Sequence, residues 1–253
     1  MTRPPAYLLV LLLLLPLKGK AEQITVAAAS NFTQAMEVLI VEFESRSEHS
    51  VQTVYGSSGR LYAQIINGAP FDVFFSADQD KAERLEAEGL IAAKSRFTYA
   101  IGALVLWSKE PGLMTDNADV LRQGEYRKLA LANPRLAPYG VAAVEVLQRL
   151  GLTESSRDRW ILGENIAQTF QFVDTANAEL GFVALSQVLV DDRLQTGSGW
   201  IVPAELYTPI RQDVVLLNRT DSEQAAREFL DFIRSDTARA IIESYGYRVD
   251  NIP

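Results

Sequence analysis

Two serine-containing corners of the chain, Ser30-Asn31 and Ser57-Ser58, have the residue types of an anion-binding site. Each corner follows a predicted strand and opens a predicted helix. The first turn of a helix presents unpaired N–H groups and about half a positive charge, and a serine hydroxyl adds one more donor. Two such corners facing one cleft would bind an anion without lysine or arginine. The alternative, in which these serines only cap their helices, is the more common role of serine and stays open.

Two further corners carry weaker signals of the same kind. Pro138-Tyr139-Gly140 precedes a predicted helix, where the tyrosine offers an O–H group and the following backbone offers N–H groups. Glu164-Asn165-Ile166 opens another helix, and a ligand contact there would come from backbone N–H rather than from the apolar side chain of Ile166. Without a ligand, the first corner is a turn with a packed aromatic ring, and Asn165 is a helix cap.

The chain contains few of the residue types that catalysis would need. There is no cysteine, which excludes thiol nucleophiles, zinc ribbons, iron–sulfur clusters and disulfides within the chain. The single histidine, His49, lies in a polar turn where we expect a solvated surface side chain. No serine lies in a G-x-S-x-G elbow, and the loop 56–60 lacks the ending of a P-loop. An exported hydrolase with Ser30 or Ser58 as nucleophile would therefore lack a plausible base.

Charged side chains near the corners have two interpretations each. Arg60 could add charge to an anion site or form a salt bridge on its helix. Asp78 and Asp80 could bind a metal ion or act as a base, but they more simply cap the helix that begins near Lys81. Over the whole chain, 24 basic and 32 acidic residues give a net charge of −8, which argues against a nucleic-acid-binding protein.

The N-terminus has the pattern of an export signal. Arg3 precedes an apolar run, 6–17, which as a helix would be about 18 Å long, too short for a bilayer core of roughly 30 Å. Gly19 and Ala21 supply small residues at the −3 and −1 positions of a cleavage site, so we predict removal of residues 1–21. The alternatives are an uncleaved anchor or a buried strand. Cleavage would remove three basic residues and leave a net charge of −11.

Apolar periodicity predicts strands that alternate with helices along the rest of the chain. The predicted strands are 24–28, 51–55, 71–75, 99–107, 128–132, 181–185 and 213–217. The predicted helices are 32–43, 61–66, 81–88, 141–150, 166–172, 223–233 and 236–245. This alternation is typical of an α/β fold with parallel sheets and helices on their faces. Ligands of such sheets bind beyond the carboxyl ends of the strands, where both serine corners lie.

The corners and the strands around them also resemble a known family. The resemblance is carried by 24–32, Gly56-Ser57-Ser58-Gly59 with Gln64-Ile65, 67–70 with 72–78, Asn133-Pro134 with 137–140, and 180–186. In this order, these stretches resemble the periplasmic molybdate-binding proteins of ABC transporters over nearly all of the mature chain. The resemblance implies a type II periplasmic binding protein fold with two lobes around a ligand cleft, each lobe a mainly parallel sheet flanked by helices.

The same resemblance implies a function and a set of partners. The protein would bind molybdate and tungstate in the periplasm, as a monomer, and deliver them to a membrane permease with its ATPase. It would not be an enzyme, it would need no cofactor, and molybdenum would be bound only as the oxyanion. We place the first lobe at 22–99 and 213–253 and the second at 100–212. A receptor for another tetrahedral oxyanion, such as sulfate, is the main alternative, and the exported serine hydrolase is the second.

The resemblance also implies ligand-binding positions. They are Ser30, Asn31 and Ser58 from the first lobe, and Tyr139 and Ile166 from the second. The serines would give hydroxyl and backbone donors, and Asn31 and Ile166 would give backbone N–H groups. Some family members have a ligand-contacting tyrosine where this chain has Ala184, and a small residue where it has Tyr139. We therefore expect the hydroxyl to come from Tyr139, while contacts from Ala184 or Arg60 stay open.

Overall fold

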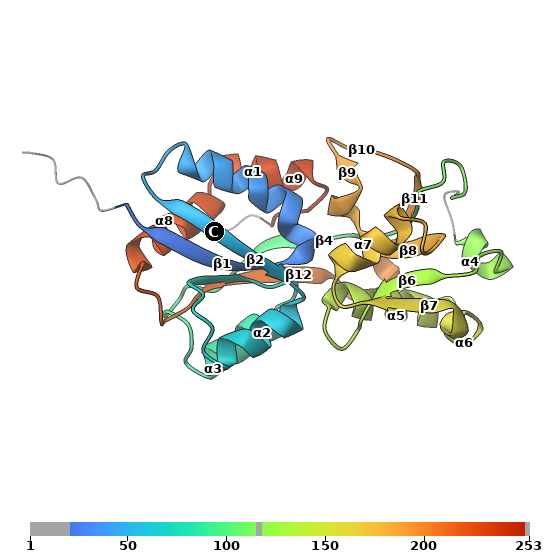
Figure 1. Cartoon of the computed structure of the whole chain (residues 1–253), viewed down its shortest axis with the longest axis horizontal. Coiled ribbons are helices and arrows are strands. Elements are labelled where there is room, and N and C mark those ends of the chain that lie inside the picture. The colour runs from blue at the N-terminus through green and yellow to red at the C-terminus, as the bar shows by residue number, and fades with distance from the viewer. Residues whose placement is uncertain (1–20, 115–117, 251–253) are drawn as a thin grey trace, which may run out of the picture.

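The computed structural model describes residues 21–114 and 118–250, which form two lobes that lie side by side (Figure 1). Except for Ala21, the predicted signal peptide 1–21 lies outside the described residues, so its cleavage stays a prediction. Within the described ranges, no helix is long and apolar enough to cross a membrane.

The first lobe is built on a five-stranded sheet with the order β2-β1-β3-β12-β4. Its strands are β1 (Gln23–Ala29), β2 (Ser50–Gly56), β3 (Val73–Phe75), β4 (Phe97–Gly102) and β12 (Ile210–Leu216). One face is covered by α1 (Thr33–Glu44), α8 (Glu223–Ile233) and α9 (Asp236–Ser244), and the other by α2 (Ser58–Ile66) and α3 (Asp80–Ala87) (Figure 1). Val26 and Ala28 pack on the α1 side, while Ala27 between them packs on the α2 side. From Val26 to Ala29 strand β1 is a continuous apolar run, because both faces of the sheet are buried there.

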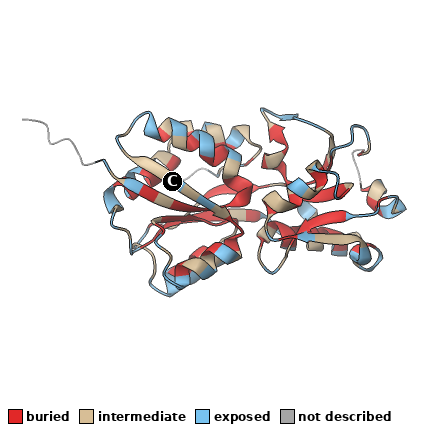
Figure 2. Cartoon of the chain, in the orientation of Figure 1, coloured by how far each residue is buried: buried red, intermediate tan, exposed pale blue. Residues whose placement is uncertain are grey.

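The second lobe repeats this design with a sheet of order β11-β5-β8-β6-β7. Its strands are β5 (Leu104–Ser108), β6 (Leu129–Ala132), β7 (Trp160–Gly163), β8 (Leu180–Ala184) and β11 (Ser198–Ile201). Helix α5 (Pro138–Arg149) packs on the face that contains Leu104 and Leu106, and α7 (Ile166–Asp174) packs on the face that contains Val105 and Trp107. Figure 2 shows buried residues concentrated in the two sheets and at the junction of the lobes.

Each sheet has four strands in one direction and one reversed strand, which confirms the predicted mainly parallel α/β architecture. In the first lobe β12 is antiparallel to both β3 and β4, and in the second lobe β5 is antiparallel to both β8 and β11. The other pairings, β1 with β2 and β3, and β6 with β7 and β8, are parallel. The reversed strands are the first strands after the chain enters each lobe from the other.

The predicted single strand 99–107 is wrong, because two strands in different sheets occupy this segment. β4 ends at Gly102, Ala103 makes the crossing, and β5 begins at Leu104. The chain returns through residues 202–209 to β12. Apolar periodicity cannot reveal a change of sheet when both strands are buried. The predicted lobe boundaries, 99/100 and 212/213, fall inside β4 and β12 and stay predictions.

Several short elements have no counterpart in the sequence-based prediction. They are α4 (Asp119–Gln123), α6 (Thr153–Ser156), β7, the β9 (Leu189–Val190) and β10 (Arg193–Leu194) hairpin, β11, and the 3-10 helices η1 (Ser30–Phe32), η2 (Arg157–Arg159), η3 (Leu185–Gln187) and η4 (Ala204–Leu206). Most are too short to show a period. β7 and β11 are edge strands of four residues each. β7 has only three apolar residues in a row, and β11 begins with Ser198 and Gly199, so neither has the longer apolar run that marks a buried strand.

Candidate functional site

A small cavity of about 10 Å³ lies where the two lobes meet, and all four predicted corners line it. Its lining residues are Ala29, Ser30, Asn31, Gly56, Ser57, Ser58, Ala77, Ala137, Pro138, Tyr139 and Ile166. The ends of β1 and β2 bring in η1 and α2 from the first lobe. The starts of α5 and α7 come from the second lobe, after β6 and β7. The structure therefore brings together the five positions that the sequence predicted, from segments more than 130 residues apart.

The serines on the first-lobe side are not helix caps. Neither Ser30 nor Ser57 makes a side-chain hydrogen bond to the helix that follows it, although Ser57 occupies the N-cap position of α2. Both hydroxyl oxygens are buried and have no hydrogen-bond partner within residues 21–114 and 118–250. A buried hydroxyl without a partner costs about 1–3 kcal/mol. The cost is recovered when a ligand occupies the cavity, so these two hydroxyls favour the ligand interpretation.

Ser57 was not among the predicted binding positions, although it lies beside Ser58. The Ser58 hydroxyl oxygen accepts a hydrogen bond from the Ala77 N–H at 2.9 Å, and its own proton is still available for donation. The Ser57 hydroxyl has neither kind of partner among the described residues. The position of Ser57 between a strand and a helix was the available signal. The sequence could not show which of the two neighbouring serines, Ser57 or Ser58, would have a hydroxyl without a partner.

Asn31 presents its backbone to the cavity because its side chain is bound elsewhere. The Asn31 amide donates to the Gln212 side-chain oxygen at 2.8 Å and to the Tyr247 hydroxyl oxygen at 2.9 Å. Its carbonyl oxygen accepts from the hydroxyls of Ser186, at 2.9 Å, and Tyr247, at 2.8 Å. These bonds fix η1, whose first N–H groups have no helical partner. This geometry agrees with a backbone role for Asn31.

Tyr139 is the second residue of α5 and lines the cavity. Pro138 at the first helical position has no N–H, so the Tyr139 N–H is an unpaired donor of this helix start. The phenol is 2% exposed, and burial raises its pKa well above the usual value, so it stays protonated and able to donate. The Gln212 side chain donates to the phenol oxygen at 3.4 Å.

Gly102 provides the space that the Tyr139 hydroxyl occupies. A Cβ at this position would lie 2.1 Å from the phenol oxygen and 2.7 Å from the Gln212 side-chain nitrogen. Gly102 is the last residue of β4, one residue before the chain crosses between the lobes. No motif in the sequence marked this glycine, because its role depends on a side chain 37 positions later in the chain.

At the start of α7, the Asn165 side chain caps the helix, while the N–H group of Ile166 is left without an acceptor inside the helix. The Asn165 side chain accepts from the Gln168 N–H at 3.0 Å, so the cap interpretation of Asn165 is confirmed. Ile166, the first residue of α7, is 3% exposed and lines the cavity. Its backbone N–H belongs to the first turn, which has no acceptor inside the helix.

Ala184 and Arg60 do not line this cavity. Ala184 is fully buried, and its N–H donates to the Gln187 side chain at 3.0 Å. Arg60 forms an ion pair with Glu164 of the second lobe at 3.0 Å, with both side chains more than half exposed. Gly59 also joins the lobes, because its N–H donates to the Leu136 carbonyl at 3.0 Å. The lobes are therefore closed on each other around the cavity.

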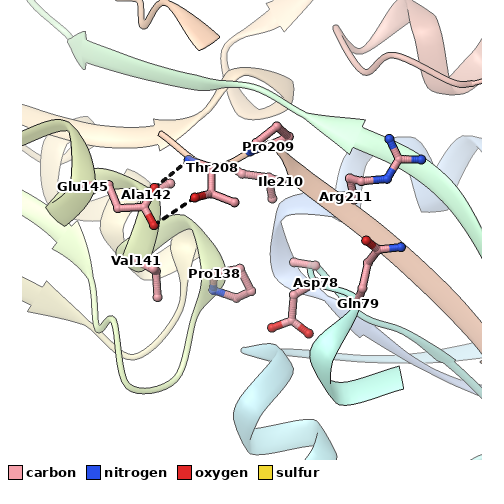
Figure 3. Close-up of a pocket in the computed structure, with 11 residues that line it drawn as sticks. Asp78, Gln79, Pro138, Val141, Ala142, Glu145, Thr208, Pro209, Ile210 and Arg211 are labelled. Atoms are coloured by element: carbon pink, nitrogen blue, oxygen red, sulfur yellow. Dashed lines mark hydrogen bonds between the residues drawn. The ribbon is translucent and has the colours of Figure 1, made fainter. Parts of the chain in front are cut away.

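The small cavity is electrostatically suited to an anion. None of the described residues that line it is charged, and the starts of α2, α5 and α7 each direct the positive end of a helix dipole toward it. A larger cavity of about 280 Å³ lies nearby, between α5, the start of α3 and residues 208–211 (Figure 3). Its lining includes the carboxylates of Asp78 and Glu145 and one cationic side chain, Arg211. The two carboxylates outnumber the one guanidinium and would repel an anion, so the smaller cavity with its neutral lining is the better candidate.

Residues with alternative catalytic interpretations have structural roles. Asp78 caps α3 by accepting from the Lys81 N–H at 3.1 Å, whereas Asp80 lies within the helix and pairs with Arg84 at 3.0 Å. Among the described residues, no cluster of His, Cys, Asp and Glu could hold a metal ion.

The prediction of a solvated His49 is wrong. Its side chain is 9% exposed, and its Nδ1 accepts from the Glu22 N–H at 3.2 Å. His49 does not line the small cavity, so it is not a base for Ser30 or Ser58.

Comparison with known proteins places this chain in a family. Residues 24–248 match the family model of the bacterial extracellular solute-binding proteins. The chain belongs to this family. It is 49% identical over 234 residues to a molybdate-binding protein of Azotobacter vinelandii, with coverage of 92% of this chain and 93% of that protein. It is 41% identical to a molybdate-binding protein of Rhodobacter capsulatus, with coverage of 97% and 96%.

A solved structure supports the same placement for this solute-binding protein. The periplasmic molybdate-binding protein of Azotobacter vinelandii superposes with a TM-score of 0.87 at 40% sequence identity, covering 90% of this chain and 99% of that chain. The resemblance to periplasmic molybdate-binding proteins, stated from sequence motifs, is confirmed by these relatives. The two-lobed fold expected from the same motifs is confirmed as well.

Proposed function

We propose that this protein is the extracytoplasmic receptor for molybdate, and also for tungstate, of an ABC transporter. The proposal rests on one observation: Ser30 and Ser57 have buried hydroxyls with no hydrogen-bond partner among the described residues, in a neutral cavity between closed lobes. A fully deprotonated oxyanion offers only acceptors, and this lining offers donors. The relatives named as molybdate-binding proteins support the choice of anion.

The ligand would be held by neutral donors from both lobes. Ser30, Ser57 and Ser58 would donate hydroxyl protons from the first lobe, and Asn31 would donate its backbone N–H. Tyr139 and the Ile166 N–H would donate from the second. Hydrogen bonds to a charged group contribute about 1.5–3 kcal/mol each. Several of them are sufficient for micromolar or tighter binding, which requires about −8 kcal/mol, against the unfavourable field of a chain with a net charge of −8.

Discrimination against sulfate would depend on size. Both ions are tetrahedral dianions that accept hydrogen bonds in the same directions, so the donors alone cannot separate them. A rigid cavity can, because an ion that is too small leaves some donors without partners. The helix starts that surround the cavity belong to well-packed lobes, and this supports selection by cavity size.

Lobe closure would couple binding to transport. The anion would touch groups of both lobes and so favour the closed arrangement, in which Gly59 meets Leu136 and Arg60 meets Glu164. A membrane permease with its ATPase would receive the anion from the closed form. The protein would act in the periplasm as a monomer after removal of residues 1–21, it would need no cofactor, and it would not be an enzyme.

Calorimetric titration of the mature protein tests this proposal. Sodium molybdate and sodium tungstate should each bind tightly with one-to-one stoichiometry, and binding should persist in excess sulfate. Heat with sulfate or phosphate and none with molybdate would keep the receptor class and overturn the ligand. No heat with any oxyanion, together with turnover of generic ester substrates, would favour the exported serine hydrolase instead.

A further inference from the structure

A buried hydrogen-bond network lies behind the small cavity and links the two lobes. Its members are Asn31, Gln212 and Tyr247 on the first-lobe side and Tyr139 and Ser186 on the second-lobe side. Gln212 is at its centre: the residue is fully buried, and a β-bulge follows it in β12. Gln212 contacts both a first-lobe ligand position, Asn31, and the Tyr139 hydroxyl. Tyr247 also contacts both groups, but Gln212 is the member that offers the Tyr139 oxygen an N–H donor.

The donors and acceptors around Gln212 have one consistent direction. The Tyr247 hydroxyl has two acceptors for its one proton, the Asn31 carbonyl at 2.8 Å and the Ser186 hydroxyl oxygen at 3.0 Å. In either case its oxygen accepts from the Asn31 amide at 2.9 Å. The same amide donates to the Gln212 side-chain oxygen at 2.8 Å, and Tyr99 donates to that oxygen at 3.0 Å. With its oxygen occupied by two donors, the Gln212 amide must direct its N–H toward Tyr139.

This direction determines what the Tyr139 hydroxyl can do. A phenol oxygen that accepts from Gln212 keeps its own proton for another acceptor. If the Gln212 amide were reversed, its oxygen would face Tyr139 and would compete with the ligand for that proton. When an anion accepts the phenol proton, the phenol oxygen also becomes a better acceptor for Gln212, because hydrogen bonds in a chain polarise one another.

We infer that Gln212 is a positioning residue for anion binding, which acts by orienting the Tyr139 O–H toward the oxyanion between the lobes. This inference rests on the proposed function. Gln212 lies outside the cavity lining, so it would act on a bound anion only through Tyr139 and Asn31. It couples the two lobes, because the residue that it holds in the first lobe, Asn31, and the residue that it orients in the second, Tyr139, are both proposed ligand groups.

A double-mutant cycle tests the inference. Gln212→Met keeps a similar length and removes the N–H donor, and Tyr139→Phe removes the hydroxyl. Titration with sodium molybdate should show about a three- to tenfold weaker affinity for Gln212→Met and about a ten- to hundredfold weaker affinity for Tyr139→Phe. The double variant should bind like Tyr139→Phe alone, within about twofold. Losses that multiply in the double variant would show a purely structural role and overturn the inference.

Two further variants keep the test decisive. Gln212→Glu keeps the oxygen that Asn31 and Tyr99 need for the fold and replaces the donor by an acceptor, so it should weaken binding more than Gln212→Met does. An unchanged affinity for Gln212→Glu would contradict the inference. Tyr99→Phe is the matched control. It removes one bond to the Gln212 oxygen, but Asn31 still donates to that oxygen and keeps the Gln212 N–H directed toward Tyr139, so affinity should stay within about twofold.

The cycle also separates this inference from the proposed function. If unmodified protein binds tungstate or sulfate but not molybdate, the choice of anion fails and the same cycle is read with the anion that binds. If the unmodified protein binds none of the three, both the receptor function and the role of Gln212 are overturned.

Discussion

The two sides of the cavity provide their donors in different ways. On the first-lobe side, Ser30 and Ser57 have buried hydroxyls without partners among the described residues. On the second-lobe side, Asn165 caps its helix and the Tyr139 hydroxyl is already held by Gln212. The first side is therefore incomplete without a ligand, whereas the second side is preorganised. A hydroxyl without a partner therefore marks a residue that serves binding, a satisfied cap such as Asn165 serves the fold, and Tyr139 is a binding group held in place before the ligand arrives.

The largest expected effect comes from filling the space beside Tyr139. Gly102→Ala would place a methyl group 2.1 Å from the phenol oxygen, so Tyr139 would have to leave its position and the preorganised side would be lost. We expect molybdate affinity to fall by about a hundredfold or more, as for a lost hydrogen bond to a charged group combined with displacement of Gln212. Calorimetric titration measures the loss. An affinity within threefold of the unmodified protein would show that the Tyr139 hydroxyl is not needed.

The next largest effects are expected at Ser30, on the first-lobe side of the cavity, and at Asn165, the helix cap on the second-lobe side. The two substitutions should affect ligand affinity and protein stability in opposite ways. Ser30→Ala should weaken molybdate binding by about ten- to a hundredfold and leave the melting temperature of ligand-free protein unchanged or slightly higher, because the hydroxyl has no partner to lose. Asn165→Ala should lower the stability of ligand-free protein by about 0.5–2 kcal/mol and leave affinity within a few-fold. Thermal unfolding and titration of both variants give the comparison.

The reverse pattern would contradict the assignment of these two residues. A Ser30→Ala protein that melts at a lower temperature but binds molybdate normally would make Ser30 structural. Asn165→Asp is a suitable control for the cap, because it preserves the side-chain oxygen that accepts from Gln168.

A smaller effect is expected from the ion pair across the mouth of the cleft. Arg60 and Glu164 are both more than half exposed, so their attraction contributes about 0–1 kcal/mol to the closed arrangement and is screened by salt. Arg60→Ala should reduce affinity by less than about fivefold, and the reduction should vanish at high ionic strength. A loss that persists in molar salt would show that Arg60 acts on the anion directly.

The smallest effect is expected from pH. Burial raises the pKa of Tyr139 well above its usual value, so the phenol keeps its proton as the pH rises through the range where an exposed tyrosine would begin to lose it. The remaining proposed donors are serine hydroxyls and backbone N–H groups, which do not titrate. Affinity for molybdate should therefore be constant between pH 7 and about 9. A steep decrease in this range would indicate an ionisable group in the site.

Local patterns in the sequence were sufficient for the mainly parallel α/β architecture. The apolar run before Ser30 and the periodicity after it predicted β1 and α1, and the same reasoning placed the other corners at strand ends. These element predictions succeeded because each depends on residues within one strand–helix unit. Family resemblance selected five candidate positions, which the fold brings to one cavity, and their role in ligand binding stays a prediction.

Features that depend on distant contacts could not be predicted. The division of 99–107 into β4 and β5 depends on which sheet each half joins. The burial of His49 depends on contacts with Glu22 and Glu228, residues 27 and 179 positions away. The roles of Gly102 and Gln212 arise from Tyr139, which lies in the other lobe. A single sequence contains no local signal for such pairs.

The most direct test of the central claim is the location of the metal in a crystal of the molybdate complex, by anomalous scattering from molybdenum. We predict a single anomalous peak between the starts of η1, α2, α5 and α7, with the hydroxyls of Ser30 and Ser57 within hydrogen-bond distance of the anion oxygens. A peak in the larger cavity beside Asp78 and Glu145, or no ordered peak between the lobes, would contradict the account.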